Sequence, residues 1–369
     1  MARFLEFFVA SLLVAILGIA VGFSLPAHRS FTHSVETNRP LNVVFDMLNG
    51  FQRFNDWNRM QQIDPNVKFT LSGPASGVGA KLEYRSSNPR VGNGSWEIAE
   101  SLQGEEISYR LENPAMGVNK TMRFRFERTG RSQRNVQIKQ RYRVEYGMNL
   151  IGRYAGMYVA SNVGDGIKAS LRSLSNALAG VPRVDYTIYE YPLLVVDLPA
   201  QNVLKVDVEA PRKDDGVAIS MTNQLEWMNK VLTDSGLEKD GPLRIVSIDF
   251  STESFTFQML QPVRAAGTEP GSSAAKTVAE LAVLNITVNG DGNPVVLAQT
   301  PPVRAVNTKW IGPAAALQRV RDTLRAWAIV RGYPLEGNGF DDYGVGIPEM
   351  LNPDAEFQAF VPLKAAEAP

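Results

Sequence analysis

The chain has 369 residues, no cysteine and two histidines, and its 38 basic and 38 acidic side chains sum to a formal net charge of zero. This length exceeds one ordinary domain, and a hydrophobic fraction of 44% suffices for two separate cores. The lack of cysteine excludes disulfides, thiolate nucleophiles and cysteine metal sites. Because His28 and His33 both follow the hydrophobic N-terminal segment, no imidazole triad, metal site or cofactor is expected.

Charge is distributed unevenly between the two halves of the chain. Residues 26–182 carry an excess of basic side chains, and residues 183–369 carry an excess of acidic ones. One interpretation is that both are solvated faces without a ligand. The other is that the basic half faces anionic lipid and the acidic half favours cationic ligands.

The N-terminal segment is long and apolar enough to cross a bilayer. Residues 7–25 carry no charge, so residues 1–29 are predicted to be a single-pass transmembrane anchor. A cleaved signal peptide is the rival interpretation, because Leu25-Pro26-Ala27 loosely resembles a cleavage site, but Leu25 and the long apolar run favour the anchor. Arg3 favours a cytoplasmic N-terminus, which would place the folded domains on the periplasmic side of a bacterial inner membrane.

The pattern of residues 30–181 predicts an antiparallel sheet that grips a long helix. Apolar and polar side chains alternate over residues 31–36, which predicts a half-buried strand. A short helix is predicted after Pro40, and one continuous amphipathic helix is predicted over 151–178. In the clearest pair of predicted strands the basic side chains share one face, without aromatic platforms for a nucleic acid. The other face is apolar: Met122, Phe124, Phe126, Val136, Ile138, Tyr142, Val144 and Tyr146. A curved sheet over one helix leaves an apolar cavity suited to a small hydrophobic molecule.

Two stretches in this half resemble a known superfamily. NRPLNVVFDMLNGFQRFNDWN and GRYAGMYVASNVGDGIKASLRSLSNAL are similar to the START-like, polyketide cyclase-type SRPBCC superfamily. The resemblance implies a helix-grip fold and a lipid-like or polycyclic ligand, and it implies no particular chemistry. The candidate pocket residues are Trp57, Trp96, Tyr109, Met116 and Phe126, with ordinary core positions as the alternative interpretation.

Residues 184–365 contain a tandem repeat. One amphipathic helix precedes Gly236 and Gly241, and a second precedes Gly332 and Gly337 at the same spacing. Each helix follows a predicted strand and is followed by others, so two strand-helix-strand-strand units are predicted to pair about a pseudo-twofold axis. A flexible connection is predicted at 264–277. The fold class predicted for the whole chain is α+β.

The second copy of the repeat also resembles a known family. VNTKWIGPAAALQRVRDTLRAWAIVRGYPLEGNGFDDY is similar to the gyrase-inhibitor-like (GyrI-like) effector-binding domain found in bacterial transcription activators. The resemblance implies an acidic residue in an aromatic cleft, usually glutamate and here Asp341. Such a carboxylate would select a cation. The expected walls are Tyr343, Trp310, Trp227 and Phe257, and the alternative for Asp341 is a turn cap.

These features favour a membrane-anchored protein that binds or senses a small molecule, hydrophobic or cationic. The alternative is a hydrolase or cyclase-type enzyme with Asp341 as general acid or base. A third hypothesis is an assembly factor with a protein partner. No helix-turn-helix pattern is visible, so no nucleic acid is expected as a partner.

Overall fold

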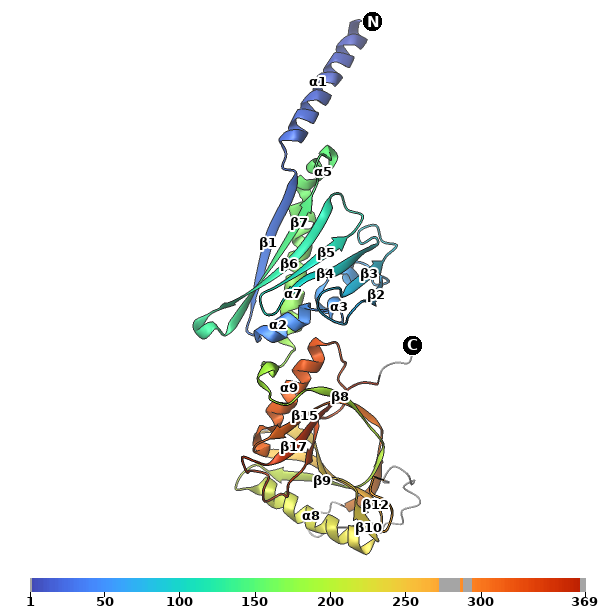
Figure 1. The fold of residues 1–369 in the computed structure, drawn as a ribbon, viewed down its shortest axis with the longest axis vertical. Coiled ribbons are helices and arrows are strands. Elements are labelled where there is room, and N and C mark those ends of the chain that lie inside the picture. The colour runs from blue at the N-terminus through green and yellow to red at the C-terminus, as the bar shows by residue number, and fades with distance from the viewer. Residues whose placement is uncertain (1, 272–285, 288–293, 366–369) are drawn as a thin grey trace. The chain divides into compact units, whose positions relative to one another are not determined.

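The computed structural model describes residues 2–271, 286–287 and 294–365, and the chain divides into two compact units (Figure 1). Unit 1 contains Met1–Asp185 and Val330–Gly332, and unit 2 contains Tyr186–Ile329 and Tyr333–Pro369. An antiparallel sheet forms the centre of each unit, and helices cover it. The predicted α+β class is therefore confirmed. Part of the predicted connection at 264–277 lies outside the described residues.

The chain begins with the apolar helix α1 (Ala2–Ser24). Its segment Phe4–Ser24 has a mean hydropathy of 2.5 and is the one helix among the described residues that is long and apolar enough to cross a membrane. Its large side chains are exposed on all sides, which suits lipid rather than a protein core. Its length and composition fit either an anchor or a signal sequence.

Unit 1 is built on a seven-stranded sheet in the order β1-β7-β6-β5-β4-β3-β2. Alternation places the apolar side chains of β6 and β7 in the core and Arg123, Arg125, Lys139, Arg141 and Arg143 on the outer face, as predicted, whereas Lys120 near the start of β6 is buried. On the outer face, Glu106 pairs with both Arg123 and Arg125. The strands are β1 (His28–Thr37), β2 (Lys68–Ser72), β3 (Lys81–Arg85), β4 (Gly94–Leu102), β5 (Glu106–Glu112), β6 (Val118–Thr129) and β7 (Asn135–Glu145). The helices before β2 are α2 (Leu41–Leu48), α3 (Phe54–Trp57) and α4 (Met60–Ile63), and the 3-10 turn η1 (Arg131–Gln133) joins β6 to β7.

The last helical region of unit 1 differs from the prediction of one continuous helix over 151–178. It consists of α5 (Leu150–Ala155), η2 (Gly156–Tyr158), α6 (Val159–Asn162) and α7 (Gly164–Ala179). Gly152 and Gly156 lie directly against the Tyr146 ring, and glycine is a poor helix former. α7 alone packs its apolar stripe onto the sheet, with Ile167, Leu171, Leu174 and Leu178 buried.

Unit 2 contains the predicted tandem repeat. The first copy runs β9 (Gln201–Pro211), α8 (Gly216–Asp234), β11 (Leu243–Phe250), β12 (Ser254–Ala265), and the second runs β15 (Val303–Ile311), α9 (Leu317–Val330), β16 (Phe340–Tyr343), β17 (Glu356–Pro362). The sheet order β9-β12-β11-β16-β17-β15 is symmetric about the β11–β16 pair. The flanking elements are η3 (Tyr186–Ile188), β8 (Leu194–Leu198), β10 (Leu237–Lys239), β13 (Ile286–Thr287), β14 (Pro294–Thr300) and η6 (Ala314–Ala316).

The core of unit 2 lies between its two long helices and one face of the sheet. Met221 and Met228 of α8 and Val320 and Leu324 of α9 are buried against strand residues such as Phe257. A smaller apolar cluster, centred on Phe340 and Phe360, covers the opposite face. Inner strands such as β16 and β17 therefore carry buried apolar side chains on both faces.

Gly117, which joins β5 to β6, provides a test of unit 1 packing. Its φ is +100°, and an added Cβ would clash with Val144 Cγ2. Gly117→Ala should lower the free energy of unfolding by about 2–4 kcal/mol, because backbone strain and overpacking add. Gly77→Ala is the control, since its φ is +81° but the space around it is open. Urea unfolding measures both variants, and equal losses would contradict the packing argument.

Candidate functional site

A cavity of about 210 Å³ lies between α7 and the inner face of the sheet in unit 1. Strands β4 to β7 and the β5–β6 connection supply one wall, and α7 with the region of α4 supplies the other. Apolar side chains dominate the lining, with a few polar groups among them. The lining includes Met60, Ile63, Trp96, Leu111, Met122, Tyr142, Val163 and Ile167, and the polar Asn58, Arg59, Asn113, Gln140 and Ser170.

Gln140 is the distinctive polar group of this cavity. It sits on β7 at an inward position between Ile138 and Tyr142, and its side chain is 2% exposed. Its amide Nε2 donates to the Met122 sulfur at 3.1 Å, a weak acceptor, while its Oε1 accepts no hydrogen bond from any described residue. An unpaired buried acceptor costs about 1–3 kcal/mol, so a donor that reached this oxygen would form a favourable hydrogen bond.

Of the five candidate pocket residues in unit 1, the cavity lining includes Trp96. Trp57, Tyr109 and Phe126 are buried in the core instead, where Trp57, Trp96 and Tyr109 belong to one network of edge-to-face aromatic contacts. The Tyr109 hydroxyl donates to the backbone carbonyl of Leu48. Met116 is 52% exposed and lies outside the lining. Gln140 was not among the predicted pocket residues, although a polar residue at an inward position of an alternating strand was a usable signal.

Unit 2 has a hollow of about 320 Å³ where the two repeats meet. The beginning of α8 and the η6 turn before α9 form its sides, as the pseudo-twofold arrangement requires. Tyr343, Phe250, Phe255, Met221 and Met350 supply aromatic and apolar surface. Arg212 lies on the rim, with its guanidinium carbon 4.0 Å from the centre of the Phe250 ring.

A second hollow in unit 2, of about 390 Å³, contains Trp310. Tyr189 and Tyr191 line it as well, and the Tyr189 and Trp310 ring centres are 6.4 Å apart. Glu190 and Arg319 bring one charge of each sign to its surface. Tyr343 and Trp310, predicted as walls of one cleft, thus line two different hollows.

Asp341 lies under α9 rather than at the surface of either hollow. It is 2% exposed, its Oδ2 forms an ion pair with Arg321 of α9, and its Oδ1 accepts no hydrogen bond from any described residue. Burial raises the pKa of the Asp341 carboxyl to about 7, although Arg321 opposes this. Burial, with Asp341 adding to it, also raises the pKa of the Tyr343 hydroxyl. The neighbouring Asp342 points to the opposite face and holds Arg244 through two hydrogen bonds of 2.6 and 3.0 Å.

The two remaining predicted wall residues also lie outside these hollows. Phe257 is fully buried and stacks on Phe255 at 4.7 Å between ring centres, so it supports the hollow from behind. Trp227 is partly buried on α8, and the Lys230 ammonium lies 5.1 Å from its ring centre.

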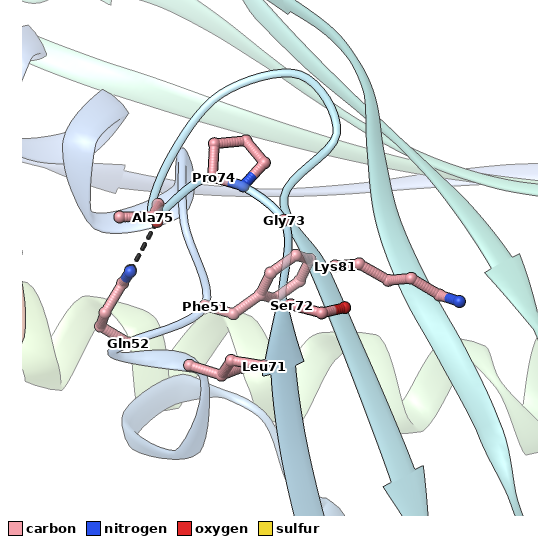
Figure 2. Close-up of a pocket in the computed structure, with 8 residues that line it drawn as sticks. All are labelled: Phe51, Gln52, Leu71, Ser72, Gly73, Pro74, Ala75 and Lys81. Carbon is pink, nitrogen blue, oxygen red and sulfur yellow. Dashed lines mark hydrogen bonds between the residues drawn. The ribbon is translucent and has the colours of Figure 1, made fainter.

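A small recess of about 100 Å³ near the β2–β3 hairpin is shown in Figure 2. Phe51, Leu71 and Lys81 surround it, and the Gln52 amide donates to the Ala75 carbonyl at 2.5 Å. Because its polar group is already paired and its volume is small, it is a weaker candidate than the other hollows.

Comparisons with known proteins assign no family. No family model and no curated protein matches the chain. Among solved structures, the EcmrR C-terminal domain matches 48% of this chain and 100% of its own at 14% identity and a TM-score of 0.35. Norcoclaurine synthase from Thalictrum flavum, in complex with dopamine and hydroxybenzaldehyde, matches 43% of this chain and 90% of its own at 11% identity and a TM-score of 0.33. Ms6760 from Mycobacterium smegmatis matches 41% of this chain and 90% of its own at 13% identity and a TM-score of 0.30. These matches are consistent with the two predicted resemblances, but at such values they carry no argument about function.

The Arg321–Asp341 pair predicts an asymmetric response to substitution. Arg321→Met leaves a buried carboxylate without its partner and should lower the free energy of unfolding of unit 2 by about 3–5 kcal/mol. Adding Asp341→Leu to that variant should restore most of the loss, since both charges are then gone. Urea unfolding of the full chain at a pH above 7, where Asp341 is ionised, measures both. As control, Arg325→Met breaks a half-exposed pair with Asp322 and should cost about 0–1 kcal/mol. If Arg321→Met and Arg325→Met lowered the free energy of unfolding equally, a buried Arg321–Asp341 pair would be contradicted.

The raised pKa of Asp341 predicts a stability that falls as pH rises. The unfolded chain releases this proton near pH ~3.9, whereas the folded unit holds it to about pH 7. Between these values the folded state binds more protons, so the free energy of unfolding decreases with increasing pH. Urea midpoints from pH 4 to 8 should therefore fall more steeply for the parent than for Asp341→Asn. Parallel profiles would show that Asp341 does not titrate in this range.

Proposed function

We propose that this chain is a membrane-anchored protein that binds a small molecule in the cavity of unit 1. The observation that carries the proposal is the side chain of Gln140, which lines an otherwise mainly apolar cavity and whose buried Oε1 accepts no hydrogen bond from the described residues. A guest with an apolar body and one hydroxyl or amine donor would satisfy this oxygen and bury its own apolar surface. The proposed activity is binding, sensing or presentation of that guest.

The cavity volume limits the size of the guest. An apolar cavity of about 150 Å³ admits a benzene molecule, and the cavity here has about 210 Å³. One or two fused rings, or a short acyl chain, would fit without a change in the sheet. Trp96 and Tyr142 offer flat aromatic surface for such rings.

The end of α1 supports an anchor that is retained rather than removed. The Arg153 guanidinium, on a side chain that is 8% exposed, donates to the carbonyls of Phe23 and Leu25 at 3.0 and 3.1 Å. The Tyr154 hydroxyl donates to the Gly18 carbonyl at 2.6 Å. A cation at the carbonyl end of a helix is favourable, and removal of the helix would leave Arg153 without these acceptors. Placement in a bacterial inner membrane with periplasmic domains is part of this proposal.

A second guest site is proposed in unit 2, in the hollow beside Tyr343. Its aromatic and methionine surface suits an apolar or amphipathic molecule. For a cationic guest to use Asp341, it would have to replace the Arg321 guanidinium. The alternative of a hydrolase or cyclase-type enzyme has less support, because the Asp341 carboxyl lies outside the lining of both hollows. A nucleic-acid partner is not part of the proposal.

Titration with 2-naphthol and naphthalene tests the Gln140 site. In the detergent-purified full chain, 2-naphthol should bind about 5- to 10-fold more tightly than naphthalene, because its hydroxyl donates to the Gln140 Oε1. Gln140→Leu should remove this preference and keep naphthalene binding. Isothermal titration calorimetry measures both compounds.

Gln137→Leu is the matched control, because Gln137 lies on the same strand β7 and points to the opposite face. It should leave the preference intact. The proposal fails if neither compound binds, or if Gln140→Leu and Gln137→Leu behave alike.

A further inference from the structure

Exposed apolar side chains gather at one end of unit 1. Among the described residues of this unit outside α1, ten large apolar side chains are exposed, and six of them belong to the β5–β6 connection or to the segment from β7 to α6. We name these six the apolar rim: Met116, Val118, Met148, Ile151, Met157 and Tyr158. Met148 and Ile151 are 73% and 70% exposed, which is unusual for side chains of this size in water.

The strand register places the rim beside the end of α1. Val118 of β6 lies opposite Glu145 of β7, and Glu145 lies opposite His28, the first residue of β1. Gly117 contacts the Tyr146 ring, which in turn covers Gly152 and Gly156. The β5–β6 connection, α5 and the beginning of β1 therefore form one end of the unit.

The connection between α1 and the end of unit 1 that carries the rim is short. Only residues 25–27 separate α1 from β1, and three extended residues span at most about 11 Å. The Ala27 carbonyl also accepts from the amides of Tyr146 and Gly147 at 2.7 and 3.3 Å. With Arg153 and Tyr154 fixed to the carbonyls of α1, the end of the helix is held against α5.

The rim is also held in shape by buried polar contacts. The Lys120 ammonium, on a side chain that is 4% exposed, donates to the backbone carbonyls of Asn113 and Ala115 and to the Asn113 side chain. Burial lowers the pKa of this ammonium. These bonds fix the connection that carries Met116. The same connection contributes Asn113 and Ala115 to the cavity lining.

We propose that the apolar rim lies in the interfacial layer of the bilayer that α1 crosses, so that unit 1 contacts the membrane through a second surface. This proposal rests on the anchor proposed above. If α1 spans the bilayer, the short tether brings the rim to its surface, where methionine, isoleucine and tyrosine side chains leave water for the boundary between headgroups and acyl chains. The cavity wall at Asn113 and Ala115 then lies next to lipid, and an apolar guest can reach the cavity from the membrane.

Site-specific labelling tests this surface, and the chain suits it because it has no cysteine. The full chain carrying Ile151→Cys or Met148→Cys is labelled with the fluorophore NBD and reconstituted in phosphatidylcholine vesicles. The expected result is a blue-shifted emission and strong quenching by lipids that carry a nitroxide near the headgroup. Leu102→Cys is the control, since Leu102 is 54% exposed at the end of β4, where it pairs with Glu106 at the end of β5 away from the rim. Its label should emit as in water and remain unquenched.

A label at Leu13→Cys in α1 separates the two proposals. Quenching of this label by nitroxides deep in the acyl region, together with shallow quenching at Ile151, supports the rim. If the Leu13 label is quenched while the Ile151 label behaves like the Leu102 control, the anchor stands and the rim proposal is overturned. If the Leu13 label is not quenched either, both proposals are overturned.

Discussion

The need to cover one apolar face of each antiparallel sheet governs the structure of both units. Strands that alternate apolar and polar side chains leave a face that must be removed from water, and a helix with one apolar stripe is the available cover. In unit 1 the cover is α7, and in unit 2 it is the pair α8 and α9. A straight helix cannot fill a curved sheet at every point. The cavity beside α7 and the hollow where the two repeats meet are consequences of this incomplete fit.

Buried polar groups in the two units have different roles because their partners differ. Asp341 has a full counter-charge in Arg321, and the pair joins β16 to α9 inside the protein. Its remaining oxygen is surrounded by the same core, which favours a structural role over ligand capture. Gln140 has only a thioether as acceptor for its amide, its carbonyl oxygen accepts no hydrogen bond from the described residues, and its side chain belongs to a cavity wall. A neutral acceptor on a side chain that lines a cavity suits a neutral guest with one donor.

The end of unit 1 that carries the apolar rim combines rigid polar contacts inside with apolar side chains outside. Arg153 and Lys120 are buried cations whose N–H groups donate hydrogen bonds to backbone carbonyls. Such contacts hold the backbone of α5 and of the β5–β6 connection, so the exposed methionine and isoleucine side chains occupy defined positions. Exposure in water is unfavourable for these side chains, but it is favourable at a lipid boundary. The anchor helix, the rim and the cavity wall therefore form one continuous arrangement in the proposed function.

Several elements could be predicted because their signals are periodic and lie within a short stretch of sequence. The apolar run of α1, the period-two alternation of β6 and β7, and the two copies of the strand-helix-strand-strand unit all depend on near neighbours in the chain. The contacts of each buried side chain, in contrast, follow from the tertiary structure. Asp341 and Arg321 are 20 positions apart and meet because α9 packs on β16, and Trp310 and Tyr343 separate because β15 and β16 lie on either side of β17. Likewise, Gln140 is a candidate binding residue because the packing of α7 on the sheet leaves a cavity that this side chain lines. Packing between residues that are far apart in the sequence sets the distances between these side chains, so a local sequence pattern does not predict them.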